Sequence, residues 1–178
     1  MAQEEKLVTE LRGKNVIVKS FGPAQELHKN GFGEKEGQKI VFTSCEGLYL
    51  CEAGKIEVHW KGNVLSFNEL MNKIYGRDKN ILTKFLVYRD LRTRGFVVKE
   101  GFGFGIDFRV YDRGDYGKKA SKYVISTLNE GNDYAFDKVF QDIKEIKKMG
   151  KESIIAVVDR RGEIIYYQLS EETFNAKK

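Results

Sequence analysis

With 178 residues, the chain is long enough for one large domain or two small ones, each with its own core. Lysine and arginine total 31 against 26 aspartate and glutamate residues, a net charge of +5 that suits a polyanionic partner. No apolar run approaches the roughly 18 residues of a membrane span, and "MAQEEKLVTEL" lacks the basic start and apolar centre of a signal peptide. We therefore expect a cytoplasmic protein without membrane contact.

Metal ligands are scarce in this sequence. Cys45 and Cys51 are six residues apart, which fits neither a zinc knuckle nor a redox CxxC motif, so we expect two buried thiols on a helix. His28 and His59 are the only histidines, which makes a zinc site a poor interpretation. Asp107 could begin a carboxylate site for Mg²⁺, but no acidic-x-lysine pair follows on a neighbouring strand. We expect no metal and no cofactor.

The N-terminal part alternates short strands and helices. "SFNELMNKIYG" begins with a capping box, in which Ser66 and Glu69 each accept from the other's backbone N–H, and the helix ends near Gly76. The other predicted elements are strands at 15–20, 39–44 and 55–60, a loop at 30–38 and a short helix at 45–54. The polar stretch "GRDKN" at 76–80 predicts a boundary between an N-terminal α+β domain (1–78) and a C-terminal domain (79–178).

The C-terminal part predicts a mixed sheet flanked by helices, an α/β (α+β) sandwich. Apolar residues recur by threes and fours in two segments, which predicts helices at 81–95 and 134–150. Predicted strands occupy 96–100, 105–112, 122–128, 153–159 and 163–170. The glycines of "GFGFG" (101–105) lie between two strands and do not open a helix, so we interpret them as a hairpin turn and reject a dinucleotide site.

Tyr111 ends a predicted strand between Arg109 and Arg113. RNA carries its own nucleophile, the 2′-hydroxyl, so it can be cleaved without metal if one group takes that proton, a second protonates the leaving 5′-oxygen and a cation stabilises the phosphorane. A phenol whose pKa is lowered by cations could be the base. From residue types alone, the simpler interpretation is that Tyr111 is an ordinary strand-end aromatic and that Lys151 is an ordinary cation after a helix that ends at Gly150.

Three stretches resemble the C-terminal domain of the archaeal tRNA-splicing endonucleases: "YRDLRTRGFVVKEGFGFGIDFRVYDRG" (88–114), "KKASKYVIS" and "GKESIIAVVDRRGEIIYYQLS". The family pattern is Y-x-D-L-R-x-R-G-[FY]-x-V-K, then G-x-D-F-x-x-Y-x-R-G, a histidine about ten residues on, and a lysine leading into I-A-x-V-D. The resemblance covers most of residues 80–170. It is looser in the N-terminal part, where "EGLYLCEAGKIEVHWKG" and "LSFNEL" carry it.

The resemblance implies a nuclease-like fold and cleavage of precursor tRNA at bulge-helix-bulge sites, by metal-free attack of the 2′-hydroxyl that leaves 2′,3′-cyclic phosphate and 5′-hydroxyl ends. The family's catalytic triad is tyrosine, histidine and lysine. By this resemblance Tyr111 lies at the tyrosine position of the triad and Lys151 at the lysine position. Ala120 lies at the histidine position. His28 and His59 lie outside this region.

Several interpretations of Ala120 remain open. The chain resembles the structural subunit of a heterotetramer, whose triad has decayed and whose partner is a histidine-bearing paralogue. It could instead be an active homo-oligomer with Lys118 or Lys119 as the acid, although a lysine of pKa near 10.4 is a poor acid at neutral pH. It could be an enzyme whose histidine was replaced by alanine. A module that binds RNA without cleaving it is a further alternative.

The resemblance also implies partners and contact residues. Precursor tRNA would meet Arg109, Arg113, Lys118 and Lys119. Protomers would pair through the last strand, as a homodimer or within a heterotetramer; that strand places Ile165, Tyr167 and Leu169 on one face. An acidic loop with Glu130 and Asp133 would dock into a neighbouring dimer, although a solvated turn is the simpler interpretation.

Overall fold

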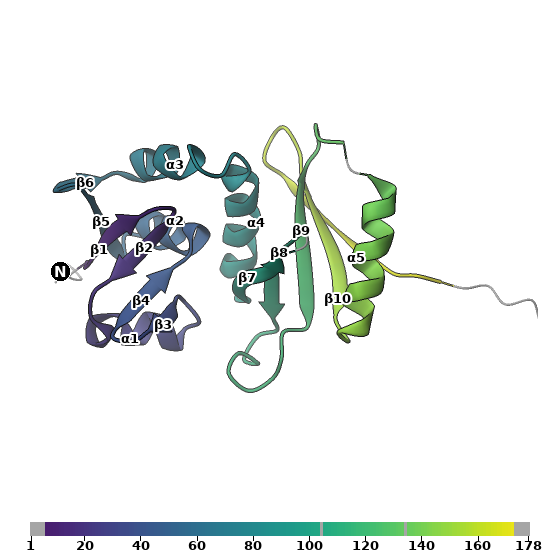
Figure 1. Cartoon of the computed structure of the whole chain (residues 1–178), viewed down its shortest axis with the longest axis horizontal. Helices are drawn as coiled ribbons and strands as arrows, with labels where there is room; N and C mark the ends of the chain where they lie inside the picture. Colours follow the sequence, from purple (N-terminus) through teal and green to yellow (C-terminus); the bar gives the residue numbers. More distant parts are fainter. Residues whose placement is uncertain (1–5, 104, 134, 173–178) are drawn as a thin grey trace, which may run out of the picture. The chain divides into compact units, whose positions relative to one another are not determined.

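The computed structural model describes residues 6–103, 105–133 and 135–172 and forms two compact units, Met1–Asp90 and Leu91–Lys178, called unit 1 and unit 2 (Figure 1). The division falls inside helix α4 (Ile81–Thr93). The predicted domain boundary between residues 78 and 79 stays a prediction, because compactness alone does not show where an independently folding domain begins. In the part of the chain that the structure describes, no helix is long and apolar enough to cross a membrane.

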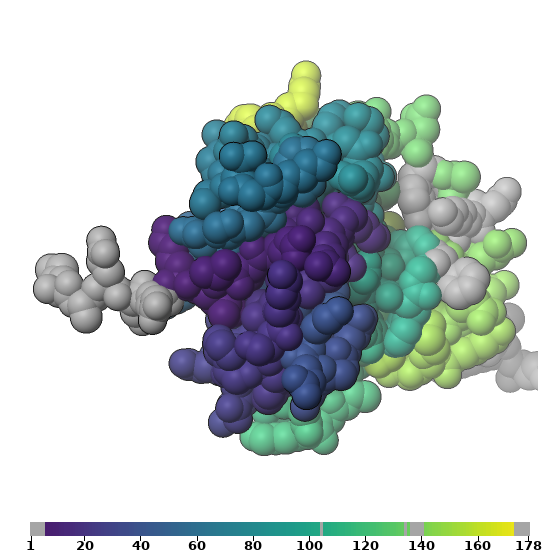
Figure 2. Space-filling view, turned by 60° about the vertical axis from the view of Figure 1, so that its left-hand side comes forward, coloured from purple at the N-terminus to yellow at the C-terminus, as the bar shows by residue number. Residues whose placement is uncertain are grey.

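Unit 1 contains a six-stranded sheet in the order β3-β4-β2-β1-β5-β6. Its strands are β1 (Leu7–Arg12), β2 (Asn15–Val18), β3 (Glu34–Glu36), β4 (Lys39–Phe42), β5 (Ile56–Trp60) and β6 (Asn63–Leu65). Only the pair β1–β5 is parallel. In Figure 2 the residues of β1 and β2 (purple) lie between residues near 60–75 (blue, above) and near 25–45 (indigo, below), in agreement with this order.

One face of this sheet forms the core of unit 1. Val16, Val18 and Val58 are fully or almost fully buried, because alternate residues of a strand point to the same side. Helix α2 (Ser44–Glu52) packs on β2, β4 and β5. Its Gly47 permits the close approach, since a Cβ there would lie 2.6 Å from the Cγ2 atom of Val16.

Two capping boxes determine where helices of unit 1 begin. The box predicted at Ser66 and Glu69 is confirmed and starts α3 (Phe67–Tyr75). Thr43 and Glu46 form a second box at α2 that we did not predict. The Glu46 carboxylate is 1% exposed and also accepts from the backbone N–H of Gly33 at 3.0 Å. The preceding loop is therefore tied to the start of α2 by a buried charge that has hydrogen-bond donors on both sides.

Parts of unit 1 differ from the predictions. The predicted loop at 30–38 contains β3, whose three exposed, charged residues carry no apolar alternation and form a strand only by pairing with β4. Strands β1 and β6 and helix α1 (Phe21–Lys29) were not predicted. Pro23 lies in the first turn of α1, where its missing N–H costs nothing. Cys45 is buried as expected, whereas Cys51 is only half-buried.

Unit 2 has the predicted mixed sheet, in the order β11-β10-β9-β8-β7. The strands are β7 (Val97–Gly103), β8 (Ile106–Tyr111), β9 (Tyr123–Asn129), β10 (Glu152–Val158) and β11 (Ile164–Leu169). Neighbouring strands are antiparallel except for β9 and β10. Helix α5 (Phe136–Lys148) connects the parallel pair and lies along one face of the sheet (Figure 1), with Ile143 and Ile146 buried. The predicted α+β fold class is confirmed.

Candidate functional site

The strand register of unit 2 gathers the three triad positions at one end of the sheet. Val110, Tyr123 and Glu152 are neighbours across β8, β9 and β10. Tyr111 follows Val110 along β8, while Ala120 and Lys151 precede the other two strands. Since β8 runs opposite to β9 and β10, these three residues are displaced toward the same end. The prediction that they belong together in space has this geometric support, while their chemical roles stay predictions.

Lys151 is held in a defined position by the segment that contains Ala120. Its Nζ atom donates to the carbonyl oxygen and to Oγ of Ser121, both at 2.7 Å. Gly150, at φ 66°, ends α5 in the left-handed region, and the backbone N–H of Lys151 donates back to Ile146. Partial burial, and then the positive charge of Arg109, lower the pKa of Lys151. The ammonium group of Lys151, which follows the end of helix α5, is therefore bound to Ser121.

Tyr111 is half-buried at the end of β8. Its ring meets Tyr116 edge to face, with ring centroids 5.1 Å apart. Tyr116 belongs to the loop between β8 and β9, where the backbone N–H groups of Lys118 and Lys119 donate to the carbonyl oxygen of Asp115. This local turn supports the ring that packs against Tyr111. Sequence reasoning missed Tyr116 because nothing in "DYGKK" indicates which way its side chain points.

The four predicted RNA-contacting cations are in different environments. Arg109 donates from Nε to the carbonyl oxygen of Glu100 at 2.8 Å, and its guanidinium lies 5.0 Å from the centroid of Phe102. The guanidinium of Arg113 lies 5.5 Å from the centroid of Phe96. The arginine contacts described are therefore with phenylalanine rings and backbone, whereas the sequence spacing suggested that both arginines flank Tyr111. Lys119 forms an ion pair with Asp115 at 2.9 Å, and Lys118 is exposed in the same loop.

The predicted assembly residues lie on β11 and on the loop after β9. Ile165 and Tyr167 are 53% and 51% exposed on the strand that ends the sheet, and Leu169 is half-buried. Glu130 accepts from the backbone N–H of Arg160 and lies 3.7 Å from its guanidinium, so it already contacts the β10–β11 turn of its own chain. Asp133 is exposed in the same loop.

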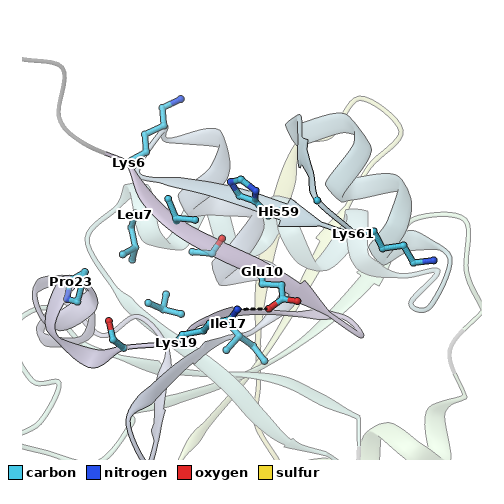
Figure 3. A pocket seen from close by; sticks show the side chains of 13 residues that line it. Lys6, Leu7, Glu10, Ile17, Lys19, Pro23, His59 and Lys61 are labelled. Carbon is cyan, nitrogen blue, oxygen red and sulfur yellow. Dashed lines mark ion pairs between the residues drawn. The ribbon is translucent and has the colours of Figure 1, made fainter.

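A cavity in unit 1 is lined by none of these predicted residues. It has a volume of about 700 Å³ and is lined by residues of β1, β2, β5 and the start of α1 (Figure 3). Two of its lining residues, Lys19 and Glu10, form an ion pair of 3.6 Å. Among the described residues of the whole chain, no three His, Cys, Asp or Glu side chains form a group that could hold a metal ion.

Comparison with known proteins identifies relatives over nearly the whole chain. Residues 8–71 match the family model described as the tRNA intron endonuclease N-terminal domain, and residues 81–166 match that of the catalytic C-terminal domain. A tRNA-splicing endonuclease of Pyrococcus horikoshii is 32% identical over 160 residues, covering 89% of this chain and 92% of the relative. One from Methanococcus vannielii is 29% identical over 171 residues, covering 95% and 97%.

Two further similarities differ in extent. The tRNA-splicing endonuclease of Methanosarcina mazei is 30% identical over 165 residues, which are 92% of this chain but 46% of that relative. Among solved structures, the Holliday junction resolvase Hjc of Archaeoglobus fulgidus superposes with a TM-score of 0.41 at 17% identity, covering 51% of this chain and 73% of Hjc. With matches to both domains and a 32% identical relative covered over nine tenths of its length, this chain belongs to the tRNA-splicing endonuclease family.

Proposed function

We propose that this chain is a structural subunit of a tRNA-splicing endonuclease that acts on precursor tRNA together with a histidine-bearing relative. The observation that carries the proposal is Ala120. It precedes Ser121, the residue that holds Lys151, and lies at the same end of the sheet as Tyr111. A methyl group at this place has no proton to give.

The chemistry explains why that one position decides the role. In the proposed reaction the 2′-oxygen attacks the adjacent phosphorus and its proton passes to a base, the role assigned to a tyrosine such as Tyr111. The bond from phosphorus to the 5′-oxygen breaks, and that oxygen must take a proton from an acid. A cation such as Lys151 stabilises the charge of the phosphorane. Loss of a general acid typically costs about 10²- to 10⁴-fold in rate, so an alanine here leaves little activity.

The environment of the nearby lysines supports the structural role over a substitute acid. Lys119 is paired with the Asp115 carboxylate at 2.9 Å, so its ammonium is directed to a group of its own loop. Lysine ammonium groups are in general poor acids at neutral pH. Lys151 has a lowered pKa, but its Nζ hydrogen bonds are directed to Ser121.

The test is cleavage of a precursor tRNA that contains a bulge-helix-bulge. We expect no cleavage by the purified chain, and cleavage without added metal once a histidine-bearing relative is mixed in, leaving 2′,3′-cyclic phosphate and 5′-hydroxyl ends. In that mixture Tyr111→Phe and Lys151→Ala in this chain should change the rate less than about twofold, while the equivalent changes in the partner should abolish it.

The same assay separates the alternatives. Brisk cleavage by the unmodified chain, lost in Tyr111→Phe, would overturn the structural role. Activity gained by Ala120→His in the isolated chain would identify an enzyme that lost its histidine. RNA binding without cleavage in any mixture would indicate a binding module.

We propose further that the loop with Glu130 and Asp133 contributes to a tetramer. The double change Glu130→Lys with Asp133→Lys should reduce the assembly to dimers, most strongly at low salt. Glu34→Lys, on the charged strand β3 of unit 1, is the matched control and should leave the tetramer intact. A tetramer that survives the double reversal at low and high salt would show that the loop is only a turn.

A further inference from the structure

The only tryptophan of the chain has two lysines on its ring. The Nζ atoms of Lys73 and Lys61 lie 3.4 Å and 4.7 Å from the centroid of Trp60. Lys73 belongs to α3, whereas Trp60 ends β5 and Lys61 follows it in the turn to β6. Two separate segments of unit 1 thus bring positive charges to one aromatic ring, whose face attracts cations. We call Trp60, Lys61 and Lys73 the indole cluster.

The positive charges of the indole cluster are not neutralised by carboxylates. Among the described residues, neither of its ammonium groups forms an ion pair, whereas Lys84 of the same unit pairs with Asp78 at 3.0 Å. Glu69 lies one helical turn before Lys73 on α3. Its carboxylate is engaged in the capping box, where it accepts from the backbone N–H and from Oγ of Ser66 at 2.8 Å and 2.7 Å. The ring holds the two lysines in place and leaves their charge available.

The turn between β5 and β6 is an unusual place for a lysine. Lys61 and Gly62 have φ values of 49° and 85°, and Trp60 pairs with Asn63 across them. Two-residue turns with positive φ at both positions favour asparagine, aspartate or glycine followed by glycine. Lys61 is the only non-glycine residue with a positive φ in the described part of the chain. Backbone held in such a sparsely populated region is found most often where a side chain serves a function.

The same turn borders the cavity of unit 1. Lys61 and Gly62 belong to its lining, and Lys61 is labelled at its right-hand side in Figure 3. The lining contains three lysines and one carboxylate, that of Glu10, which is already paired with Lys19. The surface around the indole cluster therefore has an excess of positive charge, which is complementary to a polyanion.

We propose that the indole cluster binds the phosphate backbone of a double-stranded arm of an RNA. The inference adds a contact on unit 1 to the proposed function and rests on that function in taking RNA as the ligand. The triad positions belong to unit 2, so this contact has no part in the cleavage chemistry.

The geometry favours a duplex over an unpaired strand. Single strands are held mainly by stacking of their bases on aromatic rings, but the Lys73 ammonium occupies a face of the Trp60 ring at 3.4 Å. Lysine ammonium groups meet phosphates as compact point charges and read no base. A duplex offers them the higher density of phosphates. The contact should therefore be independent of sequence and sensitive to salt.

The experiment uses the intrinsic fluorescence of Trp60, which reports on this cluster alone because the chain has no other tryptophan. Titration of the full chain with a plain RNA duplex should change the emission, because phosphates draw the two ammonium groups away from the ring. The double change Lys61→Gln with Lys73→Gln should abolish the RNA-dependent change. It should also reduce the slope of log affinity against log salt by about 2, one for each phosphate contact.

Lys79→Gln is the matched control. Its Nζ atom lies 4.2 Å from the centroid of Tyr75, which is a contact of the same kind in the same unit. Tyr75 is two residues beyond Lys73 on α3 and so points about 200° away from it around the helix axis. The control should leave both the emission change and the salt slope as in wild type.

Lys61→Asn separates binding from a purely structural role of the turn. Asparagine tolerates a positive φ, so the urea midpoint should stay or rise, while the salt slope should fall by about 1. A lysine that served only the turn would give a variant that binds RNA like wild type, which would overturn the inference.

Two further ligands test the occupant. A single-stranded RNA of the same length should bind the cluster more weakly than the duplex, and poly-glutamate of the same total charge should change the emission little. A preference for the single strand, an equal response to poly-glutamate, or no response to the duplex would each overturn the inference. Its failure is distinguishable from that of the proposed function, because the emission of Trp60 is measured in binding and the structural role in cleavage by the mixed subunits.

Discussion

The two sheets of this protein differ in the length and polarity of their edge strands. In unit 1 the outer strands are β3 and β6, with three residues each, and β3 consists of exposed charges. In unit 2 one of the two outer strands, β11, has six residues and exposes Ile165 and Tyr167. Short and charged edge strands prevent pairing with other chains, whereas a long apolar edge invites it. We propose on this ground that a second protomer adds at β11 of unit 2.

The cations at the unit 1 cavity and at the candidate site differ in their partners. At the unit 1 cavity Lys19 pairs with Glu10 (Figure 3). In unit 2 Arg109 and Lys151 donate to neutral oxygens, and among the described residues neither forms an ion pair with a carboxylate. Arg109 and Lys151 are therefore available to a polyanion, whereas Glu10 already compensates Lys19.

The largest effect is expected from a charge placed on the exposed edge strand β11, which tests the difference between the edge strands of the two sheets. Ile165→Asp should weaken protomer association more than about a hundredfold, because an unpaired carboxylate buried in an interface costs several kcal/mol. Val64→Asp on β6 is the matched control, as Val64 and Ile165 are both 53% exposed, and it should leave association unchanged. Sedimentation equilibrium measures both. A wild-type chain that stays monomeric at micromolar concentration, alone and with a histidine-bearing relative, would contradict the prediction.

Two glycine-to-alanine substitutions, one in each unit, compare how much room the two folds leave for a side chain. Gly101→Ala should lower the free energy of unfolding by about 1–3 kcal/mol, because the new methyl group would collide with the backbone of Ile106. Gly22→Ala in helix α1 meets no atom within 4 Å and should raise it by up to about 1 kcal/mol. Urea denaturation of the two variants should give shifts of opposite sign. Similar shifts would show that the hairpin relaxes around a side chain.

The comparison of the cations is tested by the salt dependence of RNA binding. Arg109→Gln should reduce the slope of log affinity against log salt by about 1, the loss of one phosphate contact. Lys19→Gln should leave the slope unchanged, because Glu10 already compensates that lysine. Filter binding between 50 and 200 mM salt would suffice. Equal slopes for both variants would mean that Arg109 does not meet phosphate.

The smallest effect concerns two neighbouring lysines of unit 2. The pKa of Lys151 is lowered by burial and by Arg109, whereas that of Lys122 is raised by Tyr123, Glu152 and Asp112. The folded chain thus holds the Lys151 proton less tightly than the unfolded chain. The resulting destabilisation is present below the lowered pKa and is relieved as the pH rises to the ordinary lysine value. Lys122 contributes stability that is lost as the pH rises through its raised pKa.

NMR titration of the lysine Cε carbons should show Lys151 deprotonating at lower pH than Lys122. Arg109→Gln should move the Lys151 midpoint upward, because it removes one of the two causes. Identical midpoints for the two lysines, unaffected by Arg109→Gln, would contradict the assignment.

Much of the fold follows from local sequence patterns. Apolar residues at alternate positions predicted β8 to β11, and spacing by threes and fours predicted α4 and α5, because these patterns repeat with the geometry of the element itself. The Ser66 and Glu69 box fixed the start of α3 for the same reason, since all its hydrogen bonds are made within four residues. The triad positions, including the alanine at 120, came from family motifs that are continuous in sequence.

Other features were decided only by contacts between distant segments. Strand β3 exists through its pairing with β4, and no pattern within "EKE" could predict it. The hydrogen bonds of Lys151 to Ser121 and the contact of the Tyr116 ring with Tyr111 depend on strand register and on the course of loops. The sequence alone determined which residue types carry the chemistry. The tertiary structure decided which of them meet, because the direction of a side chain is set by the packing of segments that lie up to tens of residues apart in the chain.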